Sequence, residues 1–314
     1  LTATELPKWL IPRGPLTRAM RLVRFAHGEE QPRLGTLEPG TDVVVDLQAV
    51  GAGLDIGIPS SMRTLLARPR WRETIELLRD YALDEEKGLH EREEVEILSP
   101  LSEPQKIICV GLNYVGHIEE SEEEQPENPV LFSKYASALV GPGQAIEWDP
   151  ELTSEVDYEV ELAAVVGKRA RRVDQSEARD HIAGYTVAND VSARDLQFGD
   201  EQWVRGKTLD TFCPLGPAIV TEDDLGDPED LGLWTEVNGE RLQDSTTENL
   251  IFGLDELVSF CSRAFTLEPG DIILTGTPTG VGVFRDPPVL LDDGDQVTVG
   301  IEGIGELTNT CCHQ

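Results

Sequence analysis

Two glutamates stand two positions apart in a run of otherwise apolar residues, residues 158–167, and they restrict how this run can fold. Side chains alternate along a strand, so Glu159 and Glu161 point to the same face of a sheet. A third carboxylate, Asp190, follows a second apolar run. Neighbouring carboxylates that lose hydration repel one another and need compensation. A hard divalent cation held by oxygen ligands would supply it, and protonated or arginine-paired carboxylates are the structural alternative.

The larger part of the chain is strand-dominated. From about residue 130 onward, short apolar runs alternate with turns rich in Gly, Pro and Asp, and only residues 176–181 and 253–264 have helical spacing. This order predicts a β-rich α+β domain over residues 101–314 and argues against a doubly wound sheet.

A smaller α/β unit is expected over residues 20–100. Strands are predicted at residues 21–25, 41–47 and 95–98, and helices at 62–66 and 71–81. The acidic stretch 84–96 is interpreted as a solvated connector. Residues 1–19 contain three prolines and precede Met20, so they are interpreted as a flexible extension or an over-long gene start.

The chain is unusually acidic. Its formal net charge is -33, with six lysines against twenty arginines in 314 residues. Self-repulsion at this charge destabilises a compact chain at low salt, whereas at about 1 M salt the Debye length falls to about 3 Å. We therefore expect a salt-adapted, halophilic source, with an ordinary acidic enzyme as the alternative. A nucleic-acid partner is not expected, because no basic patch is present to meet phosphates.

The cysteines and the hydropathy bear on the compartment. Five cysteines match no zinc-binding spacing, and three of them lie in apolar runs, which is typical of reduced core residues. No apolar run is long enough for a transmembrane helix, and the first residues do not resemble a secretory signal. We expect a cytoplasmic protein with no membrane partner.

Three further segments carry chemistry. His117 and Glu120 are three apart at a predicted helix start and share a face, as in a general-base pair. Lys207 lies between a glycine and a threonine. Thr277 lies in a Gly/Thr-rich turn after a strand, where its hydroxyl and nearby backbone N–H groups could meet a carboxylate. Each feature alone is also typical of an ordinary surface pair, a solvated charge or a turn.

Taken together, these segments resemble the fumarylacetoacetate hydrolase (FAH) family, over about residues 106–310. Within that family, residues 280–288 and the Met20 start are most similar to the domain-containing protein 2 subgroup. The matching segments, in chain order, are residues 111–114, 132–134, 156–162, 190–195, 206–207, 211–217 and 275–278. The resemblance implies a mixed β roll with a smaller N-terminal domain, and usually a homodimer.

The resemblance also implies roles for single residues. Glu159, Glu161 and Asp190 would bind Mg²⁺ or Mn²⁺, with Ca²⁺ able to substitute in a crystal. His117 and Glu120 would form the catalytic pair, together with Lys207 as the active-site lysine.

Three residues are expected near the substrate. Thr277 matches a contact to the substrate carboxylate, and Lys134 matches a mobile-lid segment. Asn113 stands near a position at which the founding hydrolase has an aspartate ligand, so the metal would have three protein carboxylates and more open positions.

Such a site suits a 2-oxo acid or its enol. The resemblance implies a shared metal-bound enolate, with hydrolytic C–C cleavage of an acylpyruvate or isomerisation of 2-hydroxyhepta-2,4-diene-1,7-dioate as the favoured reactions. Oxaloacetate tautomerisation or decarboxylation and dehydration of a 2-keto-3-deoxy sugar acid remain alternatives. A catalytically idle metal- or ligand-binding protein is the alternative of another class.

Overall fold

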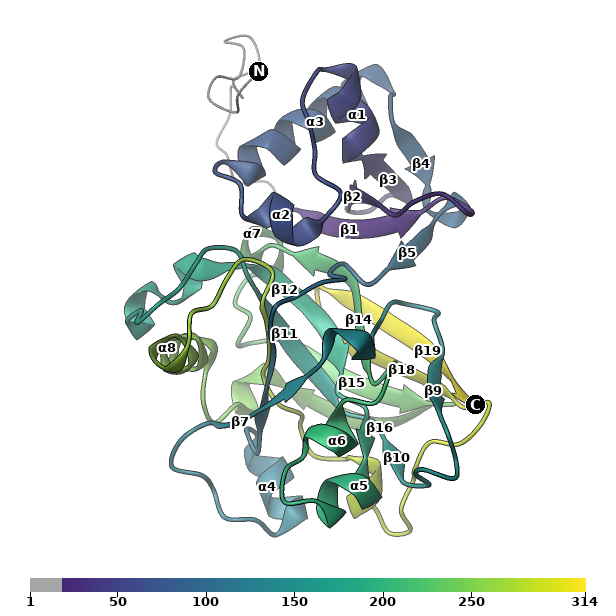
Figure 1. The fold of residues 1–314 in the computed structure, drawn as a ribbon, viewed down its shortest axis with the longest axis vertical. Helices are drawn as coiled ribbons and strands as arrows, with labels where there is room; N and C mark the ends of the chain where they lie inside the picture. Colours follow the sequence, from purple (N-terminus) through teal and green to yellow (C-terminus); the bar gives the residue numbers. More distant parts are fainter. Residues whose placement is uncertain (1–18) are drawn as a thin grey trace.

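The computed structural model describes residues 19–314, so the expected N-terminal extension lies, up to residue 18, outside the described residues. The chain forms a small unit and a larger unit stacked along the long axis (Figure 1). Among residues 19–314, no helix has the length and apolarity needed to cross a bilayer.

The small unit is a short antiparallel sheet covered by helices. Asp46 starts the first helix by accepting hydrogen bonds from the backbone N–H groups of Gln48 and Ala49, which leaves fewer helix-start donors unpaired. Its elements are β1 (Arg21–Ala26), β2 (Arg33–Leu37), β3 (Val43–Asp46), α1 (Leu47–Gly53), α2 (Met62–Leu66), α3 (Trp71–Glu85), β4 (Leu89–Glu91) and β5 (Glu96–Leu98).

The sequence suggested that the acidic stretch 84–96 is a solvated connector, but the stretch contains regular structure. It contains the end of α3, the edge strand β4 and the start of β5. β4 pairs with β3, and β5 pairs with β1. Glu91 of β4 is exposed, and a charged side chain on an edge strand discourages pairing with another chain.

The larger unit is built on two sheets. The first has the order β4-β3-β2-β1-β14-β12-β11-β17-β6-β7 and continues from the small unit into the larger one. Its strands in the larger unit are β6 (Ile107–Gly111), β7 (Val130–Lys134), β11 (Val160–Val166), β12 (Ile182–Asn189), β14 (Cys213–Val220) and β17 (Ile272–Leu274). The pairs are mostly antiparallel, with β6 and β17 parallel.

The second sheet covers one face of the first. Its order is β16 (Glu240–Thr246), β15 (Gly232–Val237), β18 (Gln296–Ile301), β19 (Gly305–His313) and β9 (Ile146–Trp148). Leu162 and Val187 of the first sheet share a buried core with Val299 and Leu307 of the second. Burying the inner faces of both sheets together stabilises this sandwich-like arrangement.

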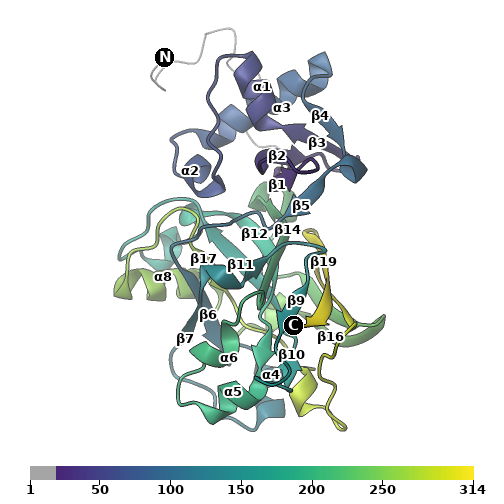
Figure 2. The ribbon, with the colours of Figure 1, turned by 45° about the vertical axis from the view of Figure 1, so that its right-hand side comes forward.

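Helix α8 (Leu254–Ala264) lies beside β17 (Figure 2), on the same face of the first sheet as the second sheet, because Ile273 of the α8 core pairs with Ala164 of the core between the sheets. Its Leu257 and Cys261 pack in a separate core with Val166 and Ile273. The β-rich α+β prediction is therefore confirmed. The helix predicted at residues 176–181 is wrong: two separate 3-10 turns, Gln175–Glu177 and Arg179–His181, take its place.

Short elements complete the larger unit. They are α4 (Val115–Ser121), β8 (Leu139–Val140), β10 (Val156–Asp157), β13 (Ser192–Ala193), α5 (Arg194–Gly199), α6 (Val204–Lys207) and α7 (Glu222–Leu225). Helices α4, α5 and α6 gather at the end of the molecule farthest from the small unit (Figure 1).

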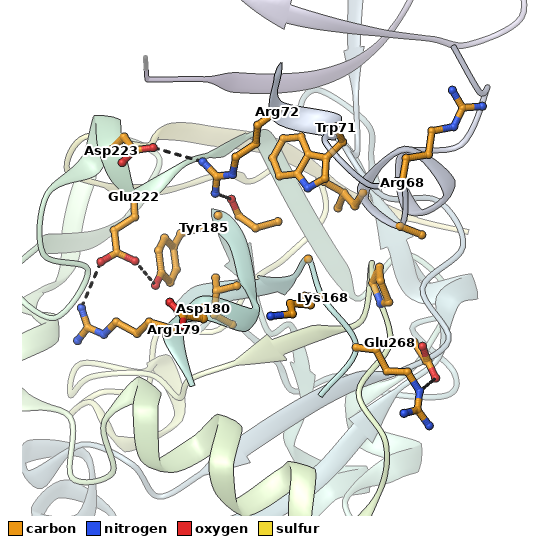
Figure 3. Close-up of a pocket in the computed structure, with 18 of the residues that line it drawn as sticks. Arg68, Trp71, Arg72, Lys168, Arg179, Asp180, Tyr185, Glu222, Asp223 and Glu268 are labelled. Atoms are coloured by element: carbon orange, nitrogen blue, oxygen red, sulfur yellow. Dashed lines mark hydrogen bonds and ion pairs between the residues drawn. The ribbon is translucent and has the colours of Figure 1, made fainter. Parts of the chain in front are cut away.

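The two units are joined by strand pairing and by ion pairs. β1 pairs antiparallel with β14, with Leu22 opposite Ile219. A cavity of about 1110 Å³ lies at the junction, where Arg72 from α3 pairs with Asp223 at 3.3 Å and donates to the Ala183 carbonyl (Figure 3). This cavity contains none of the predicted site residues.

Candidate active site

The three predicted carboxylates meet where β11 and β12 pair. Val160 lies opposite Asn189 in the register, the Asn189 side chain accepts from the Glu159 N–H, and the Asp190 N–H donates to the Glu159 carbonyl at 2.9 Å. One oxygen from each of Glu159, Glu161 and Asp190 lies within 4.8 Å of the other two, and all three residues are buried. The fold therefore brings Asp190 to the pair of glutamates for which the period of two predicted a shared face.

Two of these carboxylates are paired with buried cations. Lys207 Nζ lies 2.8 Å from Glu159 Oε2 and 3.0 Å from Asp190 Oδ2. Arg194 Nη1 lies 2.7 Å from the other oxygen of Glu159. Burial raises the pKa of Glu159, but the charges of Lys207 and Arg194 outweigh it and hold that pKa below its ordinary value. Glu159 is therefore an anion in this site.

Glu161 is the unpaired member. Among residues 19–314, no lysine or arginine forms an ion pair with it, and its Oε2 accepts the Gly276 N–H at 2.7 Å. Burial, together with the charges of Asp190 and Glu159, raises the pKa of Glu161 well above its ordinary value. Three converging carboxylates with one uncompensated charge fit a divalent cation bound through oxygen, so the residues present suit Mg²⁺ or Mn²⁺.

A glycine turn makes the Gly276 contact possible. Gly276 has a φ of 100°, a conformation that other residues rarely adopt. A Cβ there would lie 2.9 Å from the Cβ of Asn113. Only glycine fits at this point, where the backbone turns its N–H toward Glu161.

The predicted His–Glu pair is formed. His117 Nδ1 lies 2.7 Å from Glu120 Oε1 on α4. The other Glu120 oxygen accepts from the Thr279 hydroxyl and the Gly280 N–H. Although burial raises the pKa of Glu120, the hydrogen bonds from His117, Thr279 and Gly280 outweigh it and lower that pKa. An ionised Glu120 only accepts, so Nδ1 donates to it, and Nε2, which has no hydrogen-bond partner among the described residues, is left for base chemistry.

These groups face one cavity of about 250 Å³. Glu159, Glu161, Lys207, His117 and Thr277 all line it. Its remaining wall is largely apolar and aromatic and includes Leu112, Phe132, Phe198, Trp203 and Phe284. Two of these rings, Phe198 and Phe284, are also exposed to solvent, so they lie at the mouth of the cavity.

Lys134 occupies a different place from the predicted mobile lid. It ends strand β7 with a fully buried side chain, and its Nζ lies 2.6 Å from Asp190 Oδ1. It also donates to the backbone carbonyls of Val191, Lys207 and Phe212. Lys134 therefore fixes the Asp190 carboxylate by an ion pair and does not itself line the cavity.

Asn113 likewise serves the scaffold. Its amide donates to the carbonyls of Phe252 and Thr275, and its oxygen accepts the Phe252 N–H at 2.8 Å. These bonds fix the turn that contains Gly276, and Asn113 is absent from the cavity wall. Bracing of this turn replaces the substrate contact that the resemblance implied.

Arg194 is a site residue to which sequence reasoning assigned no role. Its side chain joins Asp157 and Glu159, lines the cavity and is buried. Nη2 has no hydrogen-bond partner among the described residues. Its only sequence signal was its place in the matching segment after Asp190.

A buried carboxylate cluster with cations and a free imidazole nitrogen around one small cavity is the arrangement of an acid–base enzyme. Residues 106–311 match the family model described as "Fumarylacetoacetate (FAA) hydrolase C-terminal". The chain belongs to this family.

Three similar proteins span nearly the whole chain. "Oxaloacetate tautomerase fahd2, mitochondrial" of Xenopus laevis is 44% identical over 308 residues, 97% of this chain and 93% of its own. A solved fumarylacetoacetate hydrolase from Exiguobacterium antarcticum has a TM-score of 0.79 at 37% identity, covering 94% of this chain and 100% of its own. A solved 2-hydroxyhepta-2,4-diene-1,7-dioate isomerase from Mycobacterium marinum has a TM-score of 0.74 at 36% identity, covering 94% of this chain and 99% of its own.

Proposed function

We propose that this FAH-family enzyme interconverts the keto and enol forms of oxaloacetate. The observation that carries the proposal is the 44% identity to an oxaloacetate tautomerase along 97% of the chain. The sequence alone favoured hydrolysis or dienedioate isomerisation, and this relative moves the preference to the tautomerase alternative.

Tautomerisation needs one proton moved between C3 and the C2 oxygen, with no water consumed and no C–C bond broken. His117 faces the cavity with Nε2 free, so it can accept the C3 proton and return a proton to the oxygen. Glu120 fixes the tautomer of the ring and stabilises the imidazolium that forms.

Lys207 and a bound metal ion would stabilise the negative charge that develops on the C2 oxygen of the substrate. Lys207 lines the cavity and stays protonated, because Asp190 and Glu159 raise its pKa against the effect of burial. Mg²⁺ or Mn²⁺, held by Glu159, Glu161 and Asp190, would supply Lewis-acid polarisation of a 2-oxo acid. The Thr277 hydroxyl would bind a substrate carboxylate.

A second candidate is hydrolysis of an acylpyruvate or isomerisation of the dienedioate. The observation that favours it is the aromatic wall of Phe132, Phe198, Trp203 and Phe284, because oxaloacetate has no apolar group to place there. The same His117–Glu120 pair could deprotonate water. The names of the two solved structures fit this second candidate.

The test is turnover of a small substrate panel with excess Mg²⁺. Loss of the oxaloacetate enol is followed by absorbance beside an acylpyruvate and the dienedioate. We expect enol–keto exchange to exceed the other activities and to fall about 10²–10⁴-fold in His117→Ala, with Mg²⁺ binding retained. Glu159→Ala should lose Mg²⁺ binding. Faster turnover of another panel member would transfer the function to the second candidate.

A further inference from the structure

Gln243, on strand β16 of the second sheet, reaches the active site through the core. It is completely buried and contacts two parts of the site together. Its Oε1 accepts the N–H of Val160, the residue between Glu159 and Glu161, at 3.0 Å. Its Nε2 donates to Thr277 Oγ1 and to the Pro278 carbonyl, both at 2.9 Å.

The orientation of the Gln243 amide follows from partners that cannot change role. The Val160 N–H can only donate, so the group that faces it is the amide oxygen. The Pro278 carbonyl can only accept, so the group that faces it is the NH₂. Thr235 also donates to Oε1, at 2.7 Å. A flipped amide would place its NH₂ against the Val160 N–H and its oxygen against the Pro278 carbonyl, and these buried groups would lose their hydrogen bonds.

The fixed amide decides what the Thr277 hydroxyl can do. Since Nε2 donates to Thr277 Oγ1, this oxygen accepts and its own proton points elsewhere. Among the described residues, the Gln243 contact is the one side-chain hydrogen bond of Thr277, and Thr277 lines the cavity. The hydroxyl proton is therefore left for a ligand.

We propose that Gln243 is a positioning residue that sets Thr277 as a hydrogen-bond donor to an anionic oxygen of the substrate. This inference rests on the proposed 2-oxo acid function. It makes the ligand group beside Thr277 an acceptor, such as a carboxylate. Without Gln243, the Pro278 carbonyl loses a donor and competes for the Thr277 proton.

The experiment is a double-mutant cycle on the full-length protein with Mg²⁺ present, using oxalate as a probe that carries only acceptor oxygens. Gln243→Met and Thr277→Val should each weaken oxalate binding about 10-fold in calorimetry, the loss expected for one hydrogen bond to a charged group. The double variant should be no weaker than Thr277→Val.

Thr235→Val is the matched control. It removes another hydrogen bond to Gln243 but leaves the NH₂ facing Thr277, so oxalate affinity should stay within about twofold of the wild type. Gln243→Glu is the second variant should Gln243→Met fail to fold: it keeps the acceptor for Val160 and Thr235 and replaces only the donor, and it should weaken oxalate binding in the same non-additive way.

Unchanged oxalate affinity in a folded Gln243 variant, or losses that multiply in the double variant, would overturn the inference. Absence of oxalate binding by the wild-type protein would overturn it as well. A non-additive cycle in a protein that does not turn over oxaloacetate would leave the role of Gln243 standing and reject only the proposed reaction.

Discussion

Lys207→Met offers a sharp test of the charge arrangement in the site. In the wild type, Lys207 Nζ stands between Glu159 and Asp190, at 2.8 and 3.0 Å. Removing one partner of a buried ion pair typically costs about 3–5 kcal/mol, because the remaining charges stay buried. Domain stabilities are about 5–15 kcal/mol, so the metal-free variant should lose a substantial part of its free energy of unfolding.

Mg²⁺ should reverse part of this loss. The ion places positive charge among the same carboxylates and no longer competes with the ammonium group, so Mg²⁺ should stabilise the variant more than the wild type. A tenfold gain in Mg²⁺ affinity adds about 1.4 kcal/mol at saturating ion.

The assay is urea unfolding followed by tryptophan fluorescence, in chelator and in excess Mg²⁺. Lys168→Met, at an exposed lysine, is the control and should match the wild type in both conditions. A loss below about 1 kcal/mol in chelator, the scale of an exposed pair, would refute the reasoning. An Mg²⁺ response equal to that of the wild type would refute it equally.

Three other predictions concern the carboxylates and the net charge. Glu161→Gln should abolish Mg²⁺ binding in calorimetry. In chelator it should raise the free energy of unfolding, because the amide removes repulsion from Asp190 and Glu159. A variant that is less stable than the wild type in chelator would contradict this. The pKa of Glu120 is lowered in the fold, so its ionised form stabilises the protein above the ordinary value of 4.5. That contribution is lost as the pH falls through the folded pKa. The stability gap between wild type and Glu120→Gln should therefore be constant near neutrality and narrow below pH 4.5; a gap that widens in acid would oppose the assignment. With a net charge of -33, the thermal midpoint should rise between low salt and about 1 M KCl, and a flat series would reject salt adaptation.

The parts of the site that the sequence predicted are those set by local geometry. The period of a strand placed Glu159 and Glu161 on one face, and the spacing of a helical turn joined His117 to Glu120. Both relations act within a few residues, so a pattern reveals them. Asp190 was found because it ends a second apolar run, which pairs with the first.

The parts that the sequence missed depend on contacts between distant segments. Lys134 looked like part of a lid, but the pairing of β6 with β7 brings its amine behind Asp190. Gln243 lies in an ordinary polar-apolar strand, and no local pattern indicates that its amide reaches Thr277. Residues 176–181 form two 3-10 turns in place of the predicted helix, and Ala178 between them is buried in the same core as Leu257 of α8.

The pairing of β1 with β14 has a consequence for how the chain can be divided. β8 covers the start of the free edge of β14, at Cys213 and Pro214, and β1 covers its end, at Ile219 and Val220. A shortened chain of residues 101–314 would leave the second half of this edge open, with apolar side chains and unpaired backbone groups. Open strand edges recruit other chains. The small unit thus protects this strand edge from pairing with other chains, and we expect its deletion to lower the solubility of the protein.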